Sequence, residues 1–283
     1  MNKSNSIMRL ALLQLKGSKD KTANVQNAIS KIEAAVKEHK PRLITLPECF
    51  NCPYGTKYFR EYSERIPDGY TSQQLSGIAK KHNIYIIGGT IPELGENDAI
   101  YNTCTVWDPS GQLIGKHRKM HLFDIDVKGG VRFKESETLS SGDDFCVINI
   151  DGRKIGVGIC YDIRFEEMAR LYRNEGCEMI VYPAAFNMTT GPLHWELLQR
   201  SRANDNQLFV VTTSPARDTS ADYVAYGHSM IVDPWAKVLK SAGVDEETLV
   251  ADVDFSLVEQ VRQQIPIFTQ RRLDLYGTQR RAK

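Results

Sequence analysis

The fold of this chain is decided by the stretch KIGVGICYDIRF at residues 154–165, where a strand pattern gives way to a helix pattern. Apolar residues alternate over 155–159 as in a buried strand, and those at 168–172 recur near helical spacing. Cys160 is therefore predicted on the connecting turn, beside backbone N–H groups without a helical partner. Such a turn lowers a thiol's pKa and leaves donors free for an oxyanion, so Cys160 is a candidate nucleophile. A lone cysteine at a strand end is more often a small core residue, and further evidence is needed.

The same change of pattern recurs on both sides of this stretch. The first half of the chain predicts strands at 10–15, 42–46 and 84–88 and helices at 24–38 and 72–82. A hairpin follows, with strands at 102–107 and 113–119 and a turn at 108–111. The second half predicts strands at 155–159, 179–182 and 208–213 and helices at 166–175 and 194–204. Two β-α-β-α-β units in succession predict an α/β protein.

The two halves also resemble each other in sequence. The segments LITLPECFN at 43–51 and MIVYPAAFN at 179–187 share Ile, Pro, Phe and Asn at a constant offset. We interpret them as equivalent strands of a pseudo-twofold pair of sheets; alternatively, both are merely buried strands that enter a proline-bent loop. Two sheets packed face to face with helices outside give a four-layer α-β-β-α sandwich.

Composition favours one ordinary globular domain over residues 1–283. With 41% hydrophobic and 25% charged residues, and without a linker rich in Pro, Gly or Ser, nothing divides the chain. The formal net charge of +1 gives no general attraction to nucleic acid or anionic membranes, so neither is an expected partner. No apolar run approaches the roughly 20 residues that span a bilayer.

Cysteine usage indicates the compartment. Six scattered cysteines do not form the disulfide framework of a small secreted domain, and the apolar run at 7–15 is interrupted by Arg9 and lacks a cleavage pattern. We expect a reducing, cytoplasmic location, with mitochondrial import also open.

Two charged residues lie where apolar runs end. Glu48 follows the strand-like run at 42–46, where a carboxylate needs partners and burial raises its pKa toward that of a useful base. Lys119 ends the run at 113–119. Alone, each is more often a solvated surface residue.

Together the three segments resemble the Glu-Lys-Cys motifs of the nitrilase, or carbon–nitrogen hydrolase, superfamily. The matching motifs are LPECFN at 46–51, RKMHL at 118–122 and GICYD at 158–162, in that family's order. Further segments are similar to the ω-amidase branch: PYG at 53–55, HLFDID at 121–126, FNMTTGP at 186–192 and YGHS at 226–229. The resemblance extends from residue 10 to about 276.

This resemblance implies amide hydrolysis through a cysteine thioester. Glu48 is then the base for Cys160, while the Lys119 ammonium and the Tyr161 backbone N–H hold the oxyanion. Glu135 matches the second glutamate of the family and orients Lys119 and the attacking water; otherwise it is a solvated loop acid. The chemistry requires no metal and no cofactor.

The ω-amidase branch implies a small amide substrate that carries a carboxylate, chiefly 2-oxoglutaramate or 2-oxosuccinamate. Arg164, four residues after Cys160, is suited to grip that carboxylate bidentately. Thr190 and Tyr54 are weaker candidates for hydrogen bonds to the same end. Alternatively, Arg164 binds a structural carboxylate such as Asp162 or Glu167.

Other functions stay open. The nearest alternative is an amidase for deaminated glutathione, which shares the three motifs; another is a non-catalytic partner protein that retains the fold. A third is a Cys-His hydrolase in which His121, His194 or His228 activates Cys160.

Other constellations carry less weight. The pair Cys49 and Cys52 has the spacing of a redox pair or half a zinc site, but no second pair follows. His117 and His121 lie in a strand and loop, so they are not expected to face one metal. Gly88-Gly89 and Gly129-Gly130 are predicted as turn glycines.

The family also implies a homodimer or a larger assembly built from it. The apolar, proline-bent segment at 265–268, within a C-terminal tail at about 265–283, is a candidate contact with a partner subunit.

Overall fold

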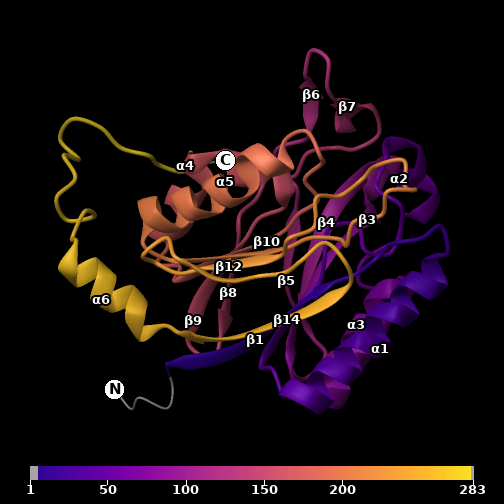
Figure 1. The fold of residues 1–283 in the computed structure, drawn as a ribbon, viewed down its shortest axis with the longest axis horizontal. Helices are drawn as coiled ribbons and strands as arrows, with labels where there is room; N and C mark the ends of the chain where they lie inside the picture. The colour runs from indigo at the N-terminus through magenta and orange to yellow at the C-terminus, as the bar shows by residue number, and fades with distance from the viewer. Residues whose placement is uncertain (1–5, 282–283) are drawn as a thin grey trace.

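The computed structural model describes residues 6–281 and has two six-stranded sheets packed face to face between helices (Figure 1). The first sheet has the order β14-β1-β2-β3-β4-β5. Its strands are β1 (Ile7–Gln14), β2 (Leu43–Thr45), β3 (Tyr85–Leu94), β4 (Ile100–Trp107), β5 (Leu113–Arg118) and β14 (Glu247–Asp254). The second has the order β13-β12-β11-β10-β9-β8. Its strands are β8 (Cys146–Ile150), β9 (Arg153–Val157), β10 (Met179–Pro183), β11 (Phe209–Thr213), β12 (Met230–Val232) and β13 (Val238–Ser241).

Helices α1 (Lys21–His39) and α3 (Tyr70–His82) cover the outer face of the first sheet, and α4 (Glu166–Asn174) and α5 (Gly191–Asn206) cover the second (Figure 1). The buried positions of α1, Val25, Ala28, Ile32 and Ala35, are spaced three and four residues apart. That spacing places them on one face, so the helix buries a single stripe. The predicted α-β-β-α sandwich is confirmed.

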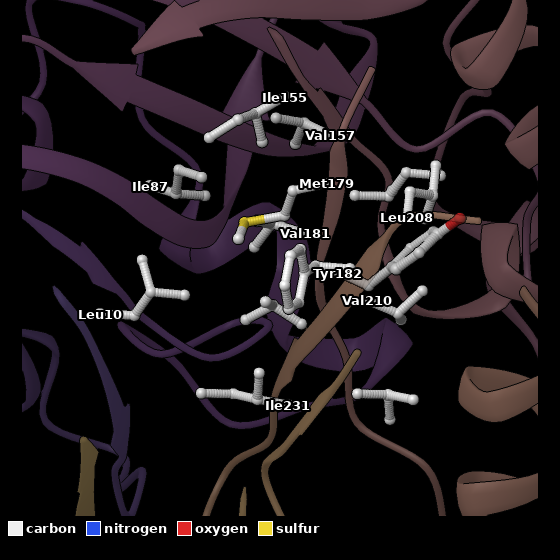
Figure 2. Packing of buried hydrophobic residues seen from close by; sticks show 14 of the residues in the cluster. Leu10, Ile87, Ile155, Val157, Met179, Val181, Tyr182, Leu208, Val210 and Ile231 are labelled. Carbon is white, nitrogen blue, oxygen red and sulfur yellow. The ribbon is translucent and has the colours of Figure 1, made fainter. Parts of the chain in front are cut away.

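The core lies between the two sheets. In Figure 2, Leu10 and Ile87 of the first sheet approach Val181, Met179 and Ile155 of the second within one buried cluster. Because this core belongs to both sheets, neither sheet is a separate unit, and the single domain over 1–283 stays a prediction.

The two sheets are related by the predicted repeat. Successive strand pairs have the same orientations in both sheets when the first sheet is counted from β14 and the second from β8. The first pair is antiparallel, the next two are parallel, and the last two are antiparallel. β2 and β10, which carry the two similar segments, occupy the same third position when the sheets are counted this way. The pseudo-twofold hypothesis is confirmed, with β14 joining from the far end of the chain.

The glycines at 88 and 89 correct the sequence prediction. They lie inside β3, at a bulge between Ile87 and Thr90, and not in a turn between elements. Gly89 has a φ of +58°, and a Cβ there would lie 2.2 Å from the carbonyl oxygen of Pro47. A side chain at 89 would therefore displace the chain just before Glu48. Gly129 lies in the hairpin turn of β6 (Asp124–Asp126) and β7 (Arg132–Lys134), as predicted.

Two further helices have no counterpart in the sequence prediction: α2 (Thr56–Tyr62) and α6 (Ser256–Gln264). After α6 the chain returns along α4, where Phe268 packs against the guanidinium groups of Arg170, Arg173 and Arg271 (Figure 1). Leu273, Leu275 and Tyr276 of this tail are exposed. Positions 282 and 283 of the predicted tail lie outside the described residues. Over residues 6–281, no helix has the length and apolar character needed to cross a membrane.

Candidate active site

Three chain segments from both sheets converge at the carboxyl ends of their strands. Glu48 lies three residues after β2, Lys119 directly follows β5, and Cys160 begins the 3-10 helix η4 (Cys160–Arg164) after β9. The turn that carries Glu48 is fixed by a 3.1 Å hydrogen bond from the Thr90 N–H to the Pro47 carbonyl. The sheet packing therefore brings together the three residues that the sequence analysis selected.

Lys119 is fully buried between two carboxylates. Its Nζ lies 3.0 Å from Oε1 of Glu48 and 3.0 Å from Oε1 of Glu135. Burial alone lowers the pKa of this ammonium, but the charges of Glu135 and Glu48 outweigh it and raise the pKa of Lys119 well above its usual value. Lys119 is thus a permanent cation.

Glu48 is oriented through both of its oxygens. Oε1 also accepts a 2.8 Å bond from Nδ2 of Asn102, and Oε2 accepts a 2.8 Å bond from the Ala185 N–H. The Cys160 thiol is close enough to this carboxylate for each group to shift the pKa of the other. Burial raises the pKa of Glu48. The charge of Glu135 adds to this rise and the charge of Lys119 opposes it, so the predicted direction is confirmed.

The Cys160 thiol corrects one prediction. The residue lies on the turn, with a φ of +44°, but burial and the nearby Glu48 charge raise the pKa of the Cys160 thiol well above its usual value. Lys119 and the Ala185 N–H only partly oppose this shift. The prediction of a lowered thiol pKa is wrong because the turn lies in the interior, where a thiolate is poorly solvated. Such a thiol requires a base.

Glu135 is buried at the start of the 3-10 helix η3 (Glu135–Glu137). Besides Lys119, it accepts a 2.6 Å bond from the Tyr54 hydroxyl and a 2.7 Å bond from the Phe123 N–H. The alternative of a solvated loop acid is excluded. Tyr54 therefore contacts Glu135, and within residues 6–281 no hydrogen bond joins it to Arg164.

Arg164 is half-buried, with its Nη1 3.2 Å from Nδ1 of His194 and its guanidinium over the ring of Phe186. Burial lowers its pKa. Among residues 6–281 no carboxylate forms an ion pair with Arg164, so the predicted alternatives Asp162 and Glu167 are not its partners. Thr190 is buried at the start of α5 and donates to Oδ1 of Asn187.

A cavity of about 540 Å³ adjoins the site on the Glu48 side. Glu48, Tyr54, Ala185 and Tyr223 contribute to its lining, whereas Cys160, Lys119 and Arg164 do not. Tyr223 packs on Tyr54 with ring centroids 4.4 Å apart and donates a 2.5 Å bond to the Ala185 carbonyl. The cavity therefore ends at the base, and aromatic side chains border it.

Comparison with known proteins agrees with this geometry. A family model described as carbon–nitrogen hydrolase matches residues 9–263. The chain belongs to the carbon–nitrogen hydrolase family. Among curated proteins of this family, the ω-amidase NIT2 of Bos taurus is 54% identical over 95% of this chain and 96% of its own. The ω-amidase NIT2 of Homo sapiens is 53% identical over 96% of this chain and 97% of its own. The crystal structure of Saccharomyces cerevisiae Nit3, a member of branch 10 of the nitrilase superfamily, superposes with a TM-score of 0.87 at 48% identity, covering 94% of this chain and 97% of that one.

The histidines of this carbon–nitrogen hydrolase do not contact Cys160. His121 lies 2.8 Å from Oδ1 of Asp162, His194 contacts Arg164, and His228 lies 3.0 Å from the Ala242 carbonyl. A Cys-His mechanism therefore lacks its base in this geometry. His117 and His121 both contact Asp162, a carboxylate of η4.

Cys49 and Cys52 are both free and buried, and both line the cavity. Burial raises the pKa of the Cys49 thiol well above its usual value, which disfavours redox chemistry. Over the described part of the chain, no group of three or more His, Cys, Asp and Glu side chains is placed to hold a metal.

Sequence reasoning missed Asn102, the Ala185 N–H and Tyr223. Asn102 is polar inside an apolar strand, and that is a usable signal because a buried amide needs a partner. The other two contact Glu48 or its neighbours through loops whose placement depends on distant segments.

Proposed function

We propose that this chain is an ω-amidase that hydrolyses the terminal amide of 2-oxo diacid monoamides through a thioester on Cys160. Curated ω-amidases similar to it over nearly their whole length support the activity. The single observation that carries the mechanism is the buried Glu48 carboxylate, which lies 3.0 Å from the Lys119 ammonium and close enough to the Cys160 thiol for the two to shift each other's pKa.

In the first half of the reaction the Cys160 sulfur attacks the amide carbon while Glu48 accepts the thiol proton. The Lys119 ammonium and the Tyr161 N–H stabilise the resulting oxyanion. When the tetrahedral intermediate collapses, the C–N bond breaks, Glu48 returns the proton to nitrogen, and ammonia leaves. The raised pKa of Glu48 makes its carboxylate a stronger base, and the raised pKa of Cys160 keeps the proton on sulfur until that base accepts it.

In the second half, water attacks the thioester carbonyl and Glu48 accepts the water proton. Collapse breaks the C–S bond, and the proton returns to sulfur, which restores the thiol and yields the diacid. Glu135 keeps Lys119 in place through the 3.0 Å contact and orients the water. No metal or cofactor enters either half.

Arg164 binds the substrate carboxylate in this proposal. A half-buried guanidinium without a carboxylate partner among residues 6–281 is costly unless an anion reaches it. A 2-oxo diacid monoamide supplies that anion at the end remote from the scissile amide. Thr190, whose hydroxyl donates to Oδ1 of Asn187, is a weaker candidate for contact with the same end. Tyr54, which binds Glu135, is better placed to support the catalytic carboxylate.

The test is a steady-state comparison of 2-oxoglutaramate, 2-oxosuccinamate and deaminated glutathione with the purified protein. We expect the first two to have the larger kcat/KM, because each carries a carboxylate for Arg164 at the end remote from its scissile amide. A large preference for deaminated glutathione favours the alternative amidase. The absence of any ammonia release favours the non-catalytic partner protein.

We further propose a cytoplasmic homodimer, with mitochondrial import still open. Six free cysteines are consistent with a reducing compartment. Leu193 and Leu197 lie one turn apart on α5 and are 68% and 59% exposed, which is consistent with a covered apolar face.

A further inference from the structure

Asp162 is a fully buried carboxylate two residues after Cys160, and the mechanism above leaves it without a role. Four donors surround its two oxygens. Oδ2 accepts a 2.9 Å bond from the Ile159 N–H and lies 3.1 Å from Nε2 of His117. Oδ1 accepts a 3.0 Å bond from the His121 N–H and lies 2.8 Å from Nδ1 of that ring.

These donors come from the two segments that carry the chemistry. Ile159 precedes Cys160, while His117 and His121 lie two residues before and after Lys119. β5 belongs to the first sheet and η4 follows β9 of the second, so one carboxylate joins the two segments across the sheet interface. His117 is still paired with Cys104 of β4, and the Lys119 N–H donates a 2.8 Å bond to the Asn102 carbonyl, whereas His121, Ile159 and Asp162 lie beyond the ends of β5 and β9.

Asp162 is charged throughout the neutral range. Burial alone raises its pKa, but the hydrogen bonds from His117 and His121 outweigh burial and hold the pKa of Asp162 far below its usual value. The His121 ring stacks on Phe165, with centroids 3.6 Å apart, and this contact fixes one donor in place. Both oxygens of the Asp162 carboxylate thus accept hydrogen bonds. An asparagine at 162 would accept through one oxygen only, because its side-chain nitrogen only donates.

We propose that Asp162 is a positioning residue that holds the Cys160 nucleophile and the Lys119 ammonium in register for the amidase reaction. The inference rests on the proposed function, and Asp162 itself touches no reacting atom. A displacement of about 1 Å in either group costs on the order of 100-fold in rate. The expected effect is therefore on the chemical step and not on substrate affinity.

The test compares Asp162→Asn with Glu167→Gln, which removes the same charge from an exposed position five residues further on. With 2-oxoglutaramate, Asp162→Asn should lower kcat about 100-fold and leave KM within about threefold, while Glu167→Gln matches the wild type. Asp162→Asn should also slow alkylation of Cys160 by iodoacetamide, followed by intact-protein mass spectrometry, at least about tenfold.

Alkylation needs no amide substrate, so it separates the two proposals. A wild-type protein without ω-amidase activity but with slowed alkylation in Asp162→Asn contradicts only the proposed function. A folded Asp162→Asn protein with wild-type kcat and alkylation overturns the positioning role.

A second pair of variants keeps the test informative if Asp162→Asn does not fold. The His121 side chain is 29% exposed, so His121→Ala removes one donor without burying a charge. We expect kcat to fall about tenfold at unchanged KM. His121→Asn, which keeps an N–H donor near the position of Nδ1, should recover most of that loss. Wild-type kcat in His121→Ala, or equal kcat in both variants, overturns the inference.

Discussion

At the scale of residues, the site consists of charges that are buried only because each has a partner. Lys119 is fully buried because two carboxylates lie 3.0 Å from its ammonium, and Glu48 is buried because Asn102 and the Ala185 N–H also bind it. Removing one partner leaves the other charge uncompensated, so single substitutions here alter more than one contact.

Glu135→Gln tests this dependence. The ammonium of Lys119 loses one of its two carboxylates and its fixed position, so we expect kcat to fall about 100-fold with a small change in KM. Glu137→Gln is the matched control, because it removes an exposed acid from the same 3-10 turn. Steady-state ammonia release measures both. Similar kcat values in the two variants contradict the role of Glu135.

The pH profile tests the state of Glu48. Burial raises its pKa above 4.5, so the base is lost as the pH falls through this raised value. We expect the acid limb of kcat/KM to have an apparent pKa clearly above 4.5, with activity retained on its alkaline side. A profile that stays flat down to pH 4.5 contradicts a buried glutamate base.

At the scale of elements, the two sheets are joined by polar contacts as well as by the apolar core. The hydroxyls of Thr45 in β2 and Thr213 in β11 lie 2.5 Å apart in the interior. On the first sheet, Glu93 of β3 binds Arg118 and Lys116 of β5 and thereby fixes the strand that precedes Lys119.

Thr45→Val should lower the free energy of unfolding by about 1–3 kcal/mol, because it leaves the Thr213 hydroxyl buried without its partner. The double variant with Thr213→Val should lose less than the sum of the two single variants. Chemical denaturation of the four proteins gives this coupling energy. Additive losses contradict a hydrogen bond between the sheets.

Glu93→Gln tests the network on β5. Burial alone raises the pKa of Glu93, but hydrogen bonds from Arg118, Lys116 and Thr103 outweigh it and lower the value to about 2. A carboxyl whose pKa is lowered on folding stabilises the fold at pH values above 4.5, its usual pKa, and this contribution is lost as the pH falls toward 2. We expect a loss of about 3 kcal/mol at pH 7 that shrinks on acidification through this window. Glu96→Gln, at an exposed position, should show no such loss at pH 7.

Much of the fold follows from local sequence, and the exceptions have physical reasons. The strand at 43–45 and the helix at 166–174 were predictable because their apolar spacing is set by the element itself. The helix at 56–62 was missed because it has few buried positions. The raised pKa of the Cys160 thiol and the four hydrogen bonds to Asp162 were missed because both depend on how deeply distant segments bury each other.

At the scale of the whole molecule, a nearly symmetric scaffold holds an asymmetric site. β2 and β10 are equivalent strands, yet Glu48 follows the first, whereas the aligned position after the second is Ala184. The backbone after β10 supplies a donor to Glu48 through the Ala185 N–H. The two halves therefore share a backbone arrangement, and after these two equivalent strands only the first half carries the carboxylate.

The proposed dimer is tested by light scattering after size exclusion. Leu193→Glu combined with Leu197→Glu places two charges on the exposed face of α5 and should convert a dimer into a monomer. Ile7→Glu, at a position that is 57% exposed on β1, is the control and should leave the dimer intact. A wild-type monomer, or a dimer that survives both changes on α5, contradicts this interface.

The most direct measurement is mass spectrometry of the protein quenched with acid during turnover of 2-oxoglutaramate. The proposed mechanism predicts an acyl adduct on the peptide that carries Cys160, absent from a Cys160→Ala variant, which also releases no ammonia above background. Ammonia release without any adduct on Cys160, an adduct confined to another cysteine, or full activity in Cys160→Ala would contradict it.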